Sequence, residues 1–327
     1  MKKYGLARSI PSKLVSQFGQ LSSIPTILLI AFCYLLIWAI SWSLKTYHHP
    51  FLWLVGIFLT GGLQHHLLTL MHEGAHYLLS PSRNWNDRMA QAFCAFPMGM
   101  HLKDYRYFHL QHHKHSGDAT KDPEIYFYNS SQIGFARKHK SVLWHVVKDF
   151  SGYHTMISLF HLSQFMKEKV KSGEIRTLNL WDFKWGLIGL MSVVSVPLLF
   201  GFFKFFCLLW FLSLFFVTPL LLRWHSVGEH TGLNEQVEQA KTLTHDFPFV
   251  INFFLYPIHS GFHLEHHLFP QVPWFRVPSF RRALLEYPAY AQEAQKLTVN
   301  GFWWGQRTVL DIVFKGNYAS LVETPRK

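Results

Sequence analysis

The sequence predicts an all-α integral membrane protein, in which two transmembrane helical hairpins, about four spans, carry a cytosolic helical cap. Three observations predict this fold class. Hydrophobic residues make up 49% of the 327 residues, whereas charged residues make up only 15%. Several runs of the chain carry almost no charge and are long enough to cross a bilayer. Motifs rich in histidine lie near the ends of these runs.

The first hairpin is predicted from two apolar runs. Residues Ile24 to Trp42 contain no charged side chain, and they match the roughly 20 residues that one crossing needs. The preceding segment, residues 1–23, is a basic leader without acidic residues. A signal peptide also starts with basic residues, but its apolar stretch is shorter and ends at a small-residue cleavage site, so we expect a retained span. A second run, from Phe51 to Met71, follows a short turn at Pro50.

The second hairpin is predicted between Trp185 and Trp224, an apolar stretch about twice as long as one crossing requires. Gly201 and Lys204 mark a tight turn near its middle. Two hairpins place the N-terminus, the loop of residues 72–184 and the C-terminal tail on one side of the membrane. That loop is rich in Lys and Arg, so the positive-inside rule predicts that this side is cytosolic.

The remaining segments are predicted to form the cytosolic cap. Met89 to Met100 is apolar but too short for a span, which is typical of an interfacial or re-entrant helix. Tyr105 to His115 indicates a helix, and Ser141 to Lys171 has an amphipathic helical pattern. We expect a membrane domain over residues 24–278, followed by a cytosolic helical tail over residues 279–327.

The net charge of +12 does not predict a nucleic-acid partner. The basic residues flank the predicted spans, where they set orientation and contact anionic membrane lipids. Cys33, Cys94 and Cys207 lie in apolar surroundings and lack the spacing of metal ligands. The sequence therefore favours neither a disulfide framework nor an iron–sulfur cluster.

Three histidine clusters dominate the chain. They are His72 and His76 in HEGAH, His109, His112 and His113 in HLQHH, and His263, His266 and His267 in HLEHH. Residues three and four apart lie on one face of an α-helix, so each cluster would direct its imidazoles to one side. Eight imidazoles are too many for one tetrahedral zinc ion but suit two neighbouring redox ions. The spacing predicts a dinuclear oxidative centre.

Two other interpretations of these motifs stay open. HEGAH also matches HExxH, in which two histidines bind zinc and Glu73 acts as the base of an intramembrane protease. That enzyme needs one more protein ligand, and it leaves HLQHH and HLEHH without a role. A metal-handling membrane protein is the alternative outside enzymes, although a transporter would carry its ligands at mid-membrane. The isolated histidines are expected to be interfacial or solvated; these are His48, His49, His65, His66, His139, His145, His154 and His161.

A fourth motif, RWHSVGEHTG, begins where the last predicted span ends. His225 and Glu229 are four residues apart, and so are Ser226 and His230. Two helix faces therefore compete as the ligand surface, and spacing does not choose between them.

The chain resembles the integral-membrane fatty acid desaturase and hydroxylase superfamily. That family carries HxxxH, HxxHH and [HQ]xxHH in this order, and the resemblance runs from about Gly61 to Pro278, including HLEHHLFPQVP. It implies two iron ions on the cytosolic side, with His230 as a ninth ligand. Some members have Asn one turn before that histidine, where this chain has Ser226. The implied ligands are His72, His76, His109, His112, His113, His230, His263, His266 and His267.

The resemblance also implies the reaction. We expect an O₂-dependent lipid desaturase that places a double bond in a long-chain fatty acyl substrate. A hydroxylase or ketolase that acts on a lipid, sphingolipid or carotenoid is the alternative within the family. The sequence contains no cytochrome b5-like segment, so electrons would come from a separate ferredoxin or cytochrome b5. Charge attraction could guide this carrier, and the candidate residues are Lys103, Arg106, Lys114 and Lys121.

Carboxylates near the clusters are candidates to accept hydrogen bonds from the outer N–H groups of ligand imidazoles. These are Glu73, Glu229, Glu265 and Asp104, together with Asp118 and Asp122.

Overall fold

The computed structural model describes residues 5–118, 120–125, 140–174, 180–230, 242–302 and 308–309. Over these residues the regular structure is helical apart from two short strands. The chain forms two compact units, each built from separate stretches of sequence. Unit 1 comprises Met1–Gln20, Gln111–Val147 and Arg223–Lys327, and unit 2 comprises Leu21–Leu110 and Lys148–Leu222. The predicted all-α class is confirmed.

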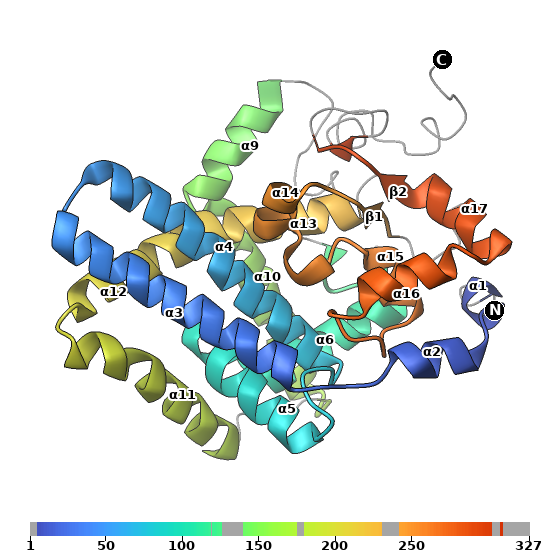
Figure 1. Cartoon of the computed structure of the whole chain (residues 1–327), viewed down its shortest axis with the longest axis horizontal. Helices are drawn as coiled ribbons and strands as arrows, with labels where there is room; N and C mark the ends of the chain where they lie inside the picture. The colour runs from blue at the N-terminus through green and yellow to red at the C-terminus, as the bar shows by residue number, and fades with distance from the viewer. Residues whose placement is uncertain are drawn as a thin grey trace. The chain divides into compact units, whose positions relative to one another are not determined.

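The first predicted hairpin lies in unit 2. Helix α3 (Ile24–Tyr47) and helix α4 (Pro50–Ala75) run side by side in opposite directions (Figure 1). Helix α3 ends because His48 adopts a left-handed conformation with a φ of 46°. Helix α4 begins at Pro50, whose ring holds φ at a helical value where no N–H is needed.

The second hairpin begins with α11 (Leu180–Leu199) and turns at Gly201, which has a φ of 71°. The returning span consists of α12 (Phe203–Leu212), a π-helical segment η3 (Ser213–Val217) and α13 (Thr218–His230). The turn lies where the sequence predicted it, because only glycine adopts this conformation without strain.

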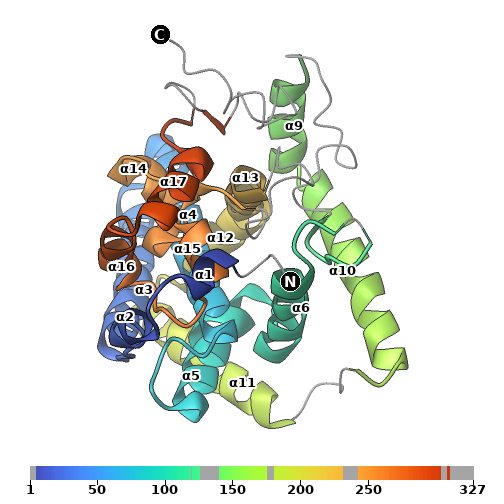
Figure 2. The same cartoon turned by 90° about the vertical axis from the view of Figure 1, so that its right-hand side faces the viewer.

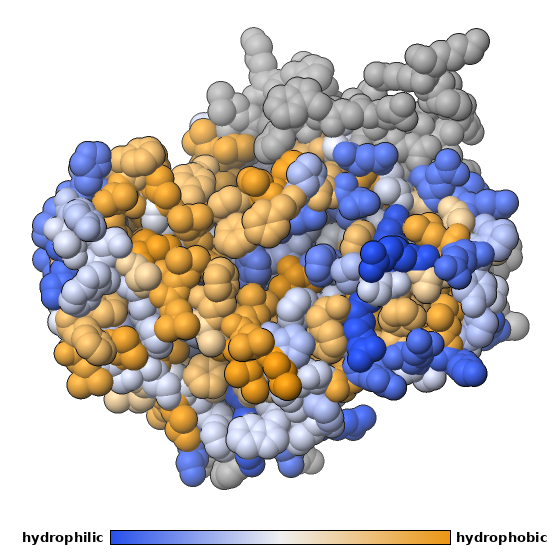
Figure 3. Space-filling view, in the orientation of Figure 1, coloured by the Kyte–Doolittle hydropathy of each residue, from blue (hydrophilic) through white to orange (hydrophobic). Residues whose placement is uncertain are grey.

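Within the described part of the chain, four helices are long and apolar enough to cross a membrane. They are Ile24–Tyr47, Pro50–Ala75, Asp182–Leu199 and Phe203–His230. Their outward faces expose large apolar side chains, and Leu28, Leu35 and Leu199 have exposed fractions of 65%, 60% and 81%. The surface over α3 is accordingly largely orange in Figure 3. Lipid tails cover such a surface, so the chain is an integral membrane protein.

The inward face of α4 carries buried polar side chains. Gln64 donates to the Trp210 carbonyl at 2.9 Å and accepts from Thr218 at 2.7 Å, which fastens α4 to the irregular part of the last span. His65 and His66 are buried beside Gln64. The expectation that these two histidines are interfacial or solvated was wrong, because α4 turns this face into the unit. The side chains of His139, His145 and His154 lie outside those that the structure describes.

The short apolar segment after α5 (Arg83–Met89) is helical, as predicted. It forms a π-helical turn η1 (Ala90–Ala95) and a 3₁₀ turn η2 (Phe96–Met98), which pack against the spans α4 and α11. A Cβ atom at Gly189 would lie 2.0 Å from the Ala92 carbonyl oxygen. Glycine therefore lets α11 lie directly against this segment.

Three further helices follow the predicted positions. They are α6 (Leu102–His115), α9 (Lys140–Phe150) and α10 (Tyr153–Lys171). Helix α6 starts in unit 2, and its last five residues belong to unit 1. One helix therefore carries His109 in unit 2 and both His112 and His113 in unit 1.

Unit 1 gathers the two ends of the chain around the third histidine motif. Its elements outside α6, α9 and α13 are α1 (Gly5–Arg8), α2 (Ser12–Phe18), β1 (Thr244–His245), α14 (Phe249–Leu255), η4 (Pro257–His259), α15 (His263–Leu268), α16 (Val277–Leu284), α17 (Pro288–Leu297) and β2 (Thr298–Val299). The strands pair in parallel, with Thr244 opposite Thr298. Phe280 of α16 packs on Phe18 and Phe269. Figure 2 shows α15 beside α16.

Candidate metal centre

Unit 2 brings three of the predicted ligands together. His72 lies in the last turn of α4, His76 is the C-cap residue of that helix, and His109 lies on α6. The Nε2 atoms of His76 and His109 are 2.9 Å apart, and the His72 and His109 ring centroids are 4.3 Å apart. Each histidine offers one nitrogen within 4.8 Å of the others. We call this set the unit 2 cluster.

An arginine holds the end of α4 where the unit 2 cluster needs it. Arg106 donates to the carbonyl oxygens of Ala75 at 3.0 Å and Gly74 at 2.9 Å, and it pairs with Asp87 at 2.5 Å. Its guanidinium also lies 3.9 Å from the ring centroid of Tyr77, a residue in the left-handed conformation directly after His76. These contacts cap the orphan carbonyls of the helix end.

The same contacts revise the expected docking group for an electron carrier. Arg106 is buried, and Lys103 forms an ion pair with Asp182 at 2.7 Å. Arg106 is therefore used inside unit 2, whereas Lys103, Lys114 and Lys121 are exposed.

Unit 1 holds a second cluster of four histidines. His112 comes from α6, His230 from the end of α13, and His263 and His267 from α15. All four are buried, and each offers one nitrogen within 4.8 Å of the others. His263 Nε2 lies 3.0 Å from His230 Nε2 and 3.0 Å from His267 Nε2. We call this set the unit 1 cluster.

The two remaining predicted ligands face each other beside the unit 1 cluster. The Nε2 atoms of His113 and His266 are 3.1 Å apart. The ring of His113 stacks on that of His267, with centroids 4.3 Å apart. Six of the nine predicted ligands thus lie together in unit 1, and the other three lie together in unit 2.

The structure uses both competing faces of the RWHSVGEHTG motif. His230 enters the unit 1 cluster, while Glu229 turns its carboxylate between two imidazoles. Glu229 Oε1 lies 2.7 Å from His225 Nε2 and 3.0 Å from His263 Nδ1. A helix presents adjacent residues about 100° apart, so one turn can supply both a ligand and the support of another ligand.

Asp122 supports the unit 1 cluster in the same way. Its carboxylate lies 2.9 Å from His112 Nδ1 and accepts the backbone N–H groups of Gly117 and Glu124. Burial alone would lower the pKa of His112, but the negative charges of Glu124 and Asp122 outweigh it and the pKa is raised. Burial and the neighbouring imidazoles lower the pKa of His267. The carboxylates around this cluster favour a bound cation.

Two predicted carboxylate partners have other contacts. Glu265 is buried and accepts from Thr244, Arg281 and Tyr290 rather than from a ligand imidazole. Asp104 lies 3.1 Å from Nδ1 of His101, which belongs to neither cluster. Sequence adjacency misleads here, because a helical neighbour of a ligand points away from it.

The other two candidates differ in their distance from a ligand. Glu73 lies 3.7 Å from His72 Nδ1. Asp118 accepts from Thr120 and closes a local turn.

The donor set fits a metal ion. Hydrogen bonds to Asp122 and Glu229 keep the proton of His112 and His263 on Nδ1, so that Nε2 presents its lone pair to the cluster. Metal–nitrogen bonds of about 2.1 Å place ligands at right angles about 3.0 Å apart and tetrahedral ligands about 3.4 Å apart. The facing Nε2 atoms of the two clusters lie 2.9 to 3.0 Å apart. Distances of this size are short enough for one ion to bind both imidazoles.

A strained turn directs α15 into the unit 1 cluster. Ile258 and His259 have positive φ angles of 50° and 63°. A β-branched residue in this region costs about 1–3 kcal/mol and persists only where surrounding structure enforces it. Such strain occurs often beside functional sites, and the sequence carries no signal for it because neither residue is glycine.

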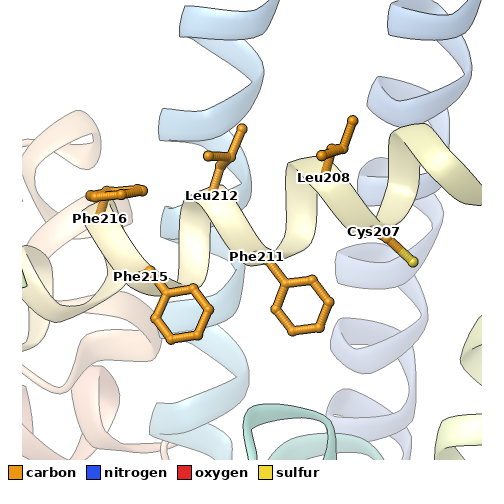
Figure 4. A pocket seen from close by; sticks show the side chains of 6 residues that line it. All are labelled: Cys207, Leu208, Phe211, Leu212, Phe215 and Phe216. Carbon is orange, nitrogen blue, oxygen red and sulfur yellow. The ribbon is translucent and has the colours of Figure 1, made fainter.

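An apolar hollow on the last span has a different character. Cys207, Leu208, Phe211, Leu212, Phe215 and Phe216 line it, and all come from α12 and η3 (Figure 4). None of these side chains is a histidine or a carboxylate. The hollow therefore belongs to the lipid-facing surface and offers no donor for a metal.

Known proteins are similar to this chain over most of its length. The chain is 25% identical over 276 residues to a dihydrorhizobitoxine desaturase from Bradyrhizobium elkanii, which covers 81% of this chain and 74% of the relative. It is 26% identical to a sphingolipid delta(4)-desaturase from Drosophila melanogaster, covering 76% of this chain and 68% of the relative. A sphingolipid delta(4)-desaturase/C4-monooxygenase from Bos taurus is 24% identical, covering 69% and 64%.

The family model for fatty acid desaturases matches residues 47–296. This range contains both spans that carry predicted ligands, all nine of these histidines and the carboxylates behind them. The chain therefore belongs to the fatty acid desaturase family and is a desaturase-type oxidoreductase of the membrane.

Proposed function

We propose that the protein is an O₂-dependent desaturase that introduces a double bond into a long-chain fatty acyl lipid. Two iron ions would be held by the nine histidines of the two units. The observation that carries this proposal is the convergence of four buried imidazoles in the unit 1 cluster, two of which, His112 and His263, have a carboxylate on their outer nitrogen. Imidazoles whose outer N–H groups are held by carboxylates are typical of metal-binding histidines, and a bound cation would use their inward nitrogens.

The chain contributes position, proton placement and exclusion of water. Asp122 and Glu229 hold the protons of His112 and His263 on Nδ1, which orients both rings. The four imidazoles of the unit 1 cluster are buried, so water has little access to them. The bound irons with O₂ would supply the oxidising power needed to remove hydrogen from an unactivated C–H bond.

The apolar spans and the relatives support a lipid substrate. Two of the named relatives act on sphingolipids, and one acts on dihydrorhizobitoxine, so the family's chemistry is applied to several carbon chains. We place a long-chain acyl lipid first, because two of the helices that carry the clusters, α4 and α13, belong to apolar spans. A sphingolipid remains the alternative substrate.

Hydroxylation is the second candidate reaction. The bovine relative is named both a desaturase and a C4-monooxygenase. The two outcomes differ only in whether a second hydrogen is removed or an oxygen atom is added. Nothing comparable favours a ketolase. A zinc protease is not supported, because the family is one of oxidoreductases and both units supply histidines beyond HEGAH.

The orientation and the partners belong to the same proposal. The positive-inside rule supports a cytosolic position for the histidine motifs. A separate ferredoxin or cytochrome b5 would deliver electrons. We also propose the segment boundaries derived from the sequence, with a leader at 1–23, a desaturase domain at 24–278 and a helical tail at 279–327.

The test combines metal analysis with lipid mass spectrometry. Wild type and His267→Ala are expressed in the same host, and purified protein is assayed for iron and zinc. We expect about two irons per chain and a lipid that lacks two hydrogen atoms only in cells with wild type. His115→Ala is the matched control, because His115 lies on α6 outside both clusters.

Other results have defined meanings. A lipid that gains one oxygen atom would assign the hydroxylase. Zinc in place of iron, with an unchanged lipid profile, would overturn the proposed function.

A further inference from the structure

Glu265 occupies an unexpected place within the third histidine motif. It lies between His263 and His266 in sequence, and its side chain is 1% exposed. Both carboxylate oxygens are engaged away from the cluster. Oε2 accepts from Thr244 Oγ1 at 2.7 Å, and Oε1 accepts from the Arg281 guanidinium and the Tyr290 hydroxyl.

The partners of Glu265 are tied to one another. Arg281 Nη2 donates to Thr298 Oγ1 at 3.1 Å, and Thr298 is paired with Thr244 across β1 and β2. Thr244 Oγ1 also accepts the backbone N–H of Leu264 at 3.3 Å. The helices α16 and α17 and both strands therefore hold α15 through one buried carboxylate.

This arrangement matters because α15 cannot hold its own position. It has six residues, three of which are predicted ligands, and two of these, His263 and His267, belong to the unit 1 cluster. A helix this short has little stability of its own, and the strained residues Ile258 and His259 precede it. On a helix, Glu265 points about 200° away from both His263 and His267. The hydrogen bonds to the Glu265 carboxylate therefore set the direction in which those two imidazoles point.

Stability alone does not account for a buried charge network. Replacing a buried ion pair with apolar side chains of similar volume is often neutral or stabilising. What such a network adds is a defined geometry, because a carboxylate that is satisfied by three donors has few alternative orientations.

We propose that Arg281 and Tyr290 are positioning residues for the metal centre, acting through Glu265 to set the imidazoles of α15. The inference rests on the proposed metal centre. It assigns a role to α16 and α17, which contain no histidine and lie in the last part of the family match.

The test separates metal retention from folding. Iron-loaded wild type, Arg281→Met, Tyr290→Phe and the double variant Glu265→Gln/Arg281→Met are purified in detergent. Each is challenged with a chelator, and the rate of iron release is measured beside the thermal unfolding midpoint. We expect iron release to be about 10-fold faster in Arg281→Met and somewhat faster than wild type in Tyr290→Phe.

The double variant distinguishes positioning from simple stabilisation. It removes the orphan charge that Arg281→Met leaves behind, so its unfolding midpoint should recover toward wild type. Iron release should stay fast, because the contact from Arg281 of α16 to residue 265 is still absent. Arg282→Met and Tyr287→Phe are matched controls on the same segment, and both should release iron like wild type; Arg282 contacts only Ser279 among its described hydrogen bonds.

Two outcomes overturn the inference. Iron release in the folded double variant at the wild-type rate would reduce the network to a stabilising role. An unchanged rate of iron release in Arg281→Met would show that the contact between Arg281 and Glu265 has no role in holding the metal. If wild type itself held no iron, the proposed function would fail and this inference with it, whereas failure of the tie alone leaves wild-type iron binding intact.

Discussion

The two clusters hold their imidazoles by different means. In unit 1, carboxylates stand behind the rings, with Asp122 on His112 and Glu229 on His263. In unit 2, the support acts on the backbone instead. Arg106 donates to the carbonyl oxygens of Gly74 and Ala75 and so fixes the end of the long helix α4. The predicted ligands of the two units thus differ in their support: a fixed helix end serves α4, whereas carboxylates serve His112 on α6 and His263 on α15.

The largest expected effect comes from removing one ligand in each unit. His263→Ala and His109→Ala should each lower product formation by about 100-fold or more, because every histidine of a cluster contributes a donor. If the two clusters hold separate ions, each variant should keep about one iron per chain. Iron analysis and lipid mass spectrometry measure both quantities. Loss of both irons from either variant would show that the clusters do not act separately.

Asp122→Asn tests the carboxylate support of unit 1. The side chain keeps its shape but loses its charge, and the His112 ring loses its fixed proton position. We expect about a 10- to 100-fold loss of iron affinity, measured by competition with a chelator. Asp118→Asn is the control, since the Asp118 carboxylate closes a local turn with Thr120 and Lys121. Equal affinities for the two variants would contradict this account of unit 1.

Arg106→Lys tests the backbone support of unit 2. Lysine keeps the charge but cannot serve Gly74, Ala75 and Asp87 together, so at least one of these acceptors loses its hydrogen bond to the charged side chain. We expect a loss of about 2 kcal/mol in stability, seen as a lower unfolding midpoint. The control, Lys103→Met, breaks a pair at an exposed lysine and should cost less than about 1 kcal/mol. A larger effect in the control would refute the importance of the helix end.

The smallest effects are expected from His101 and His245, two histidines outside the clusters. Their pKa values are shifted in opposite directions, so their contributions to stability should depend on pH with opposite signs. In unit 2, burial would lower the pKa of His101, but Asp104 and Asp182 outweigh burial and raise it. The stability from these pairs is therefore complete below about pH 6.5 and is lost as pH rises through the raised pKa. The unfolding midpoint of wild type, compared with His101→Gln, should show this loss on the alkaline side.

In unit 1, burial lowers the pKa of His245 to about 3. Below about pH 6.5 the unfolded chain binds a proton that the folded chain does not, so stability falls as pH falls. The difference between wild type and His245→Gln should therefore appear on the acidic side. The same sign for His101 and His245 would contradict the distinct environments of the two residues.

Sequence reasoning predicted those features that depend on local pattern. Apolar runs long enough to cross a bilayer located both hairpins. Gly201 located a turn, because only glycine accepts its φ angle without strain. The histidine spacing identified the motifs from which the clusters form. It also misled locally, since Glu265 sits inside a motif yet faces Arg281 and Tyr290.

The sequence by itself determined the membrane class, the helical hairpins and the histidine motifs, because hydrophobic length and helical spacing are local properties. Tertiary structure alone decided that Glu229 supports His263, that Arg106 caps α4, and that His65 and His66 are buried. Each of these contacts joins residues far apart in the chain or depends on which face of a helix turns inward. Such partners are set by packing, and packing is not written in the spacing of any one segment.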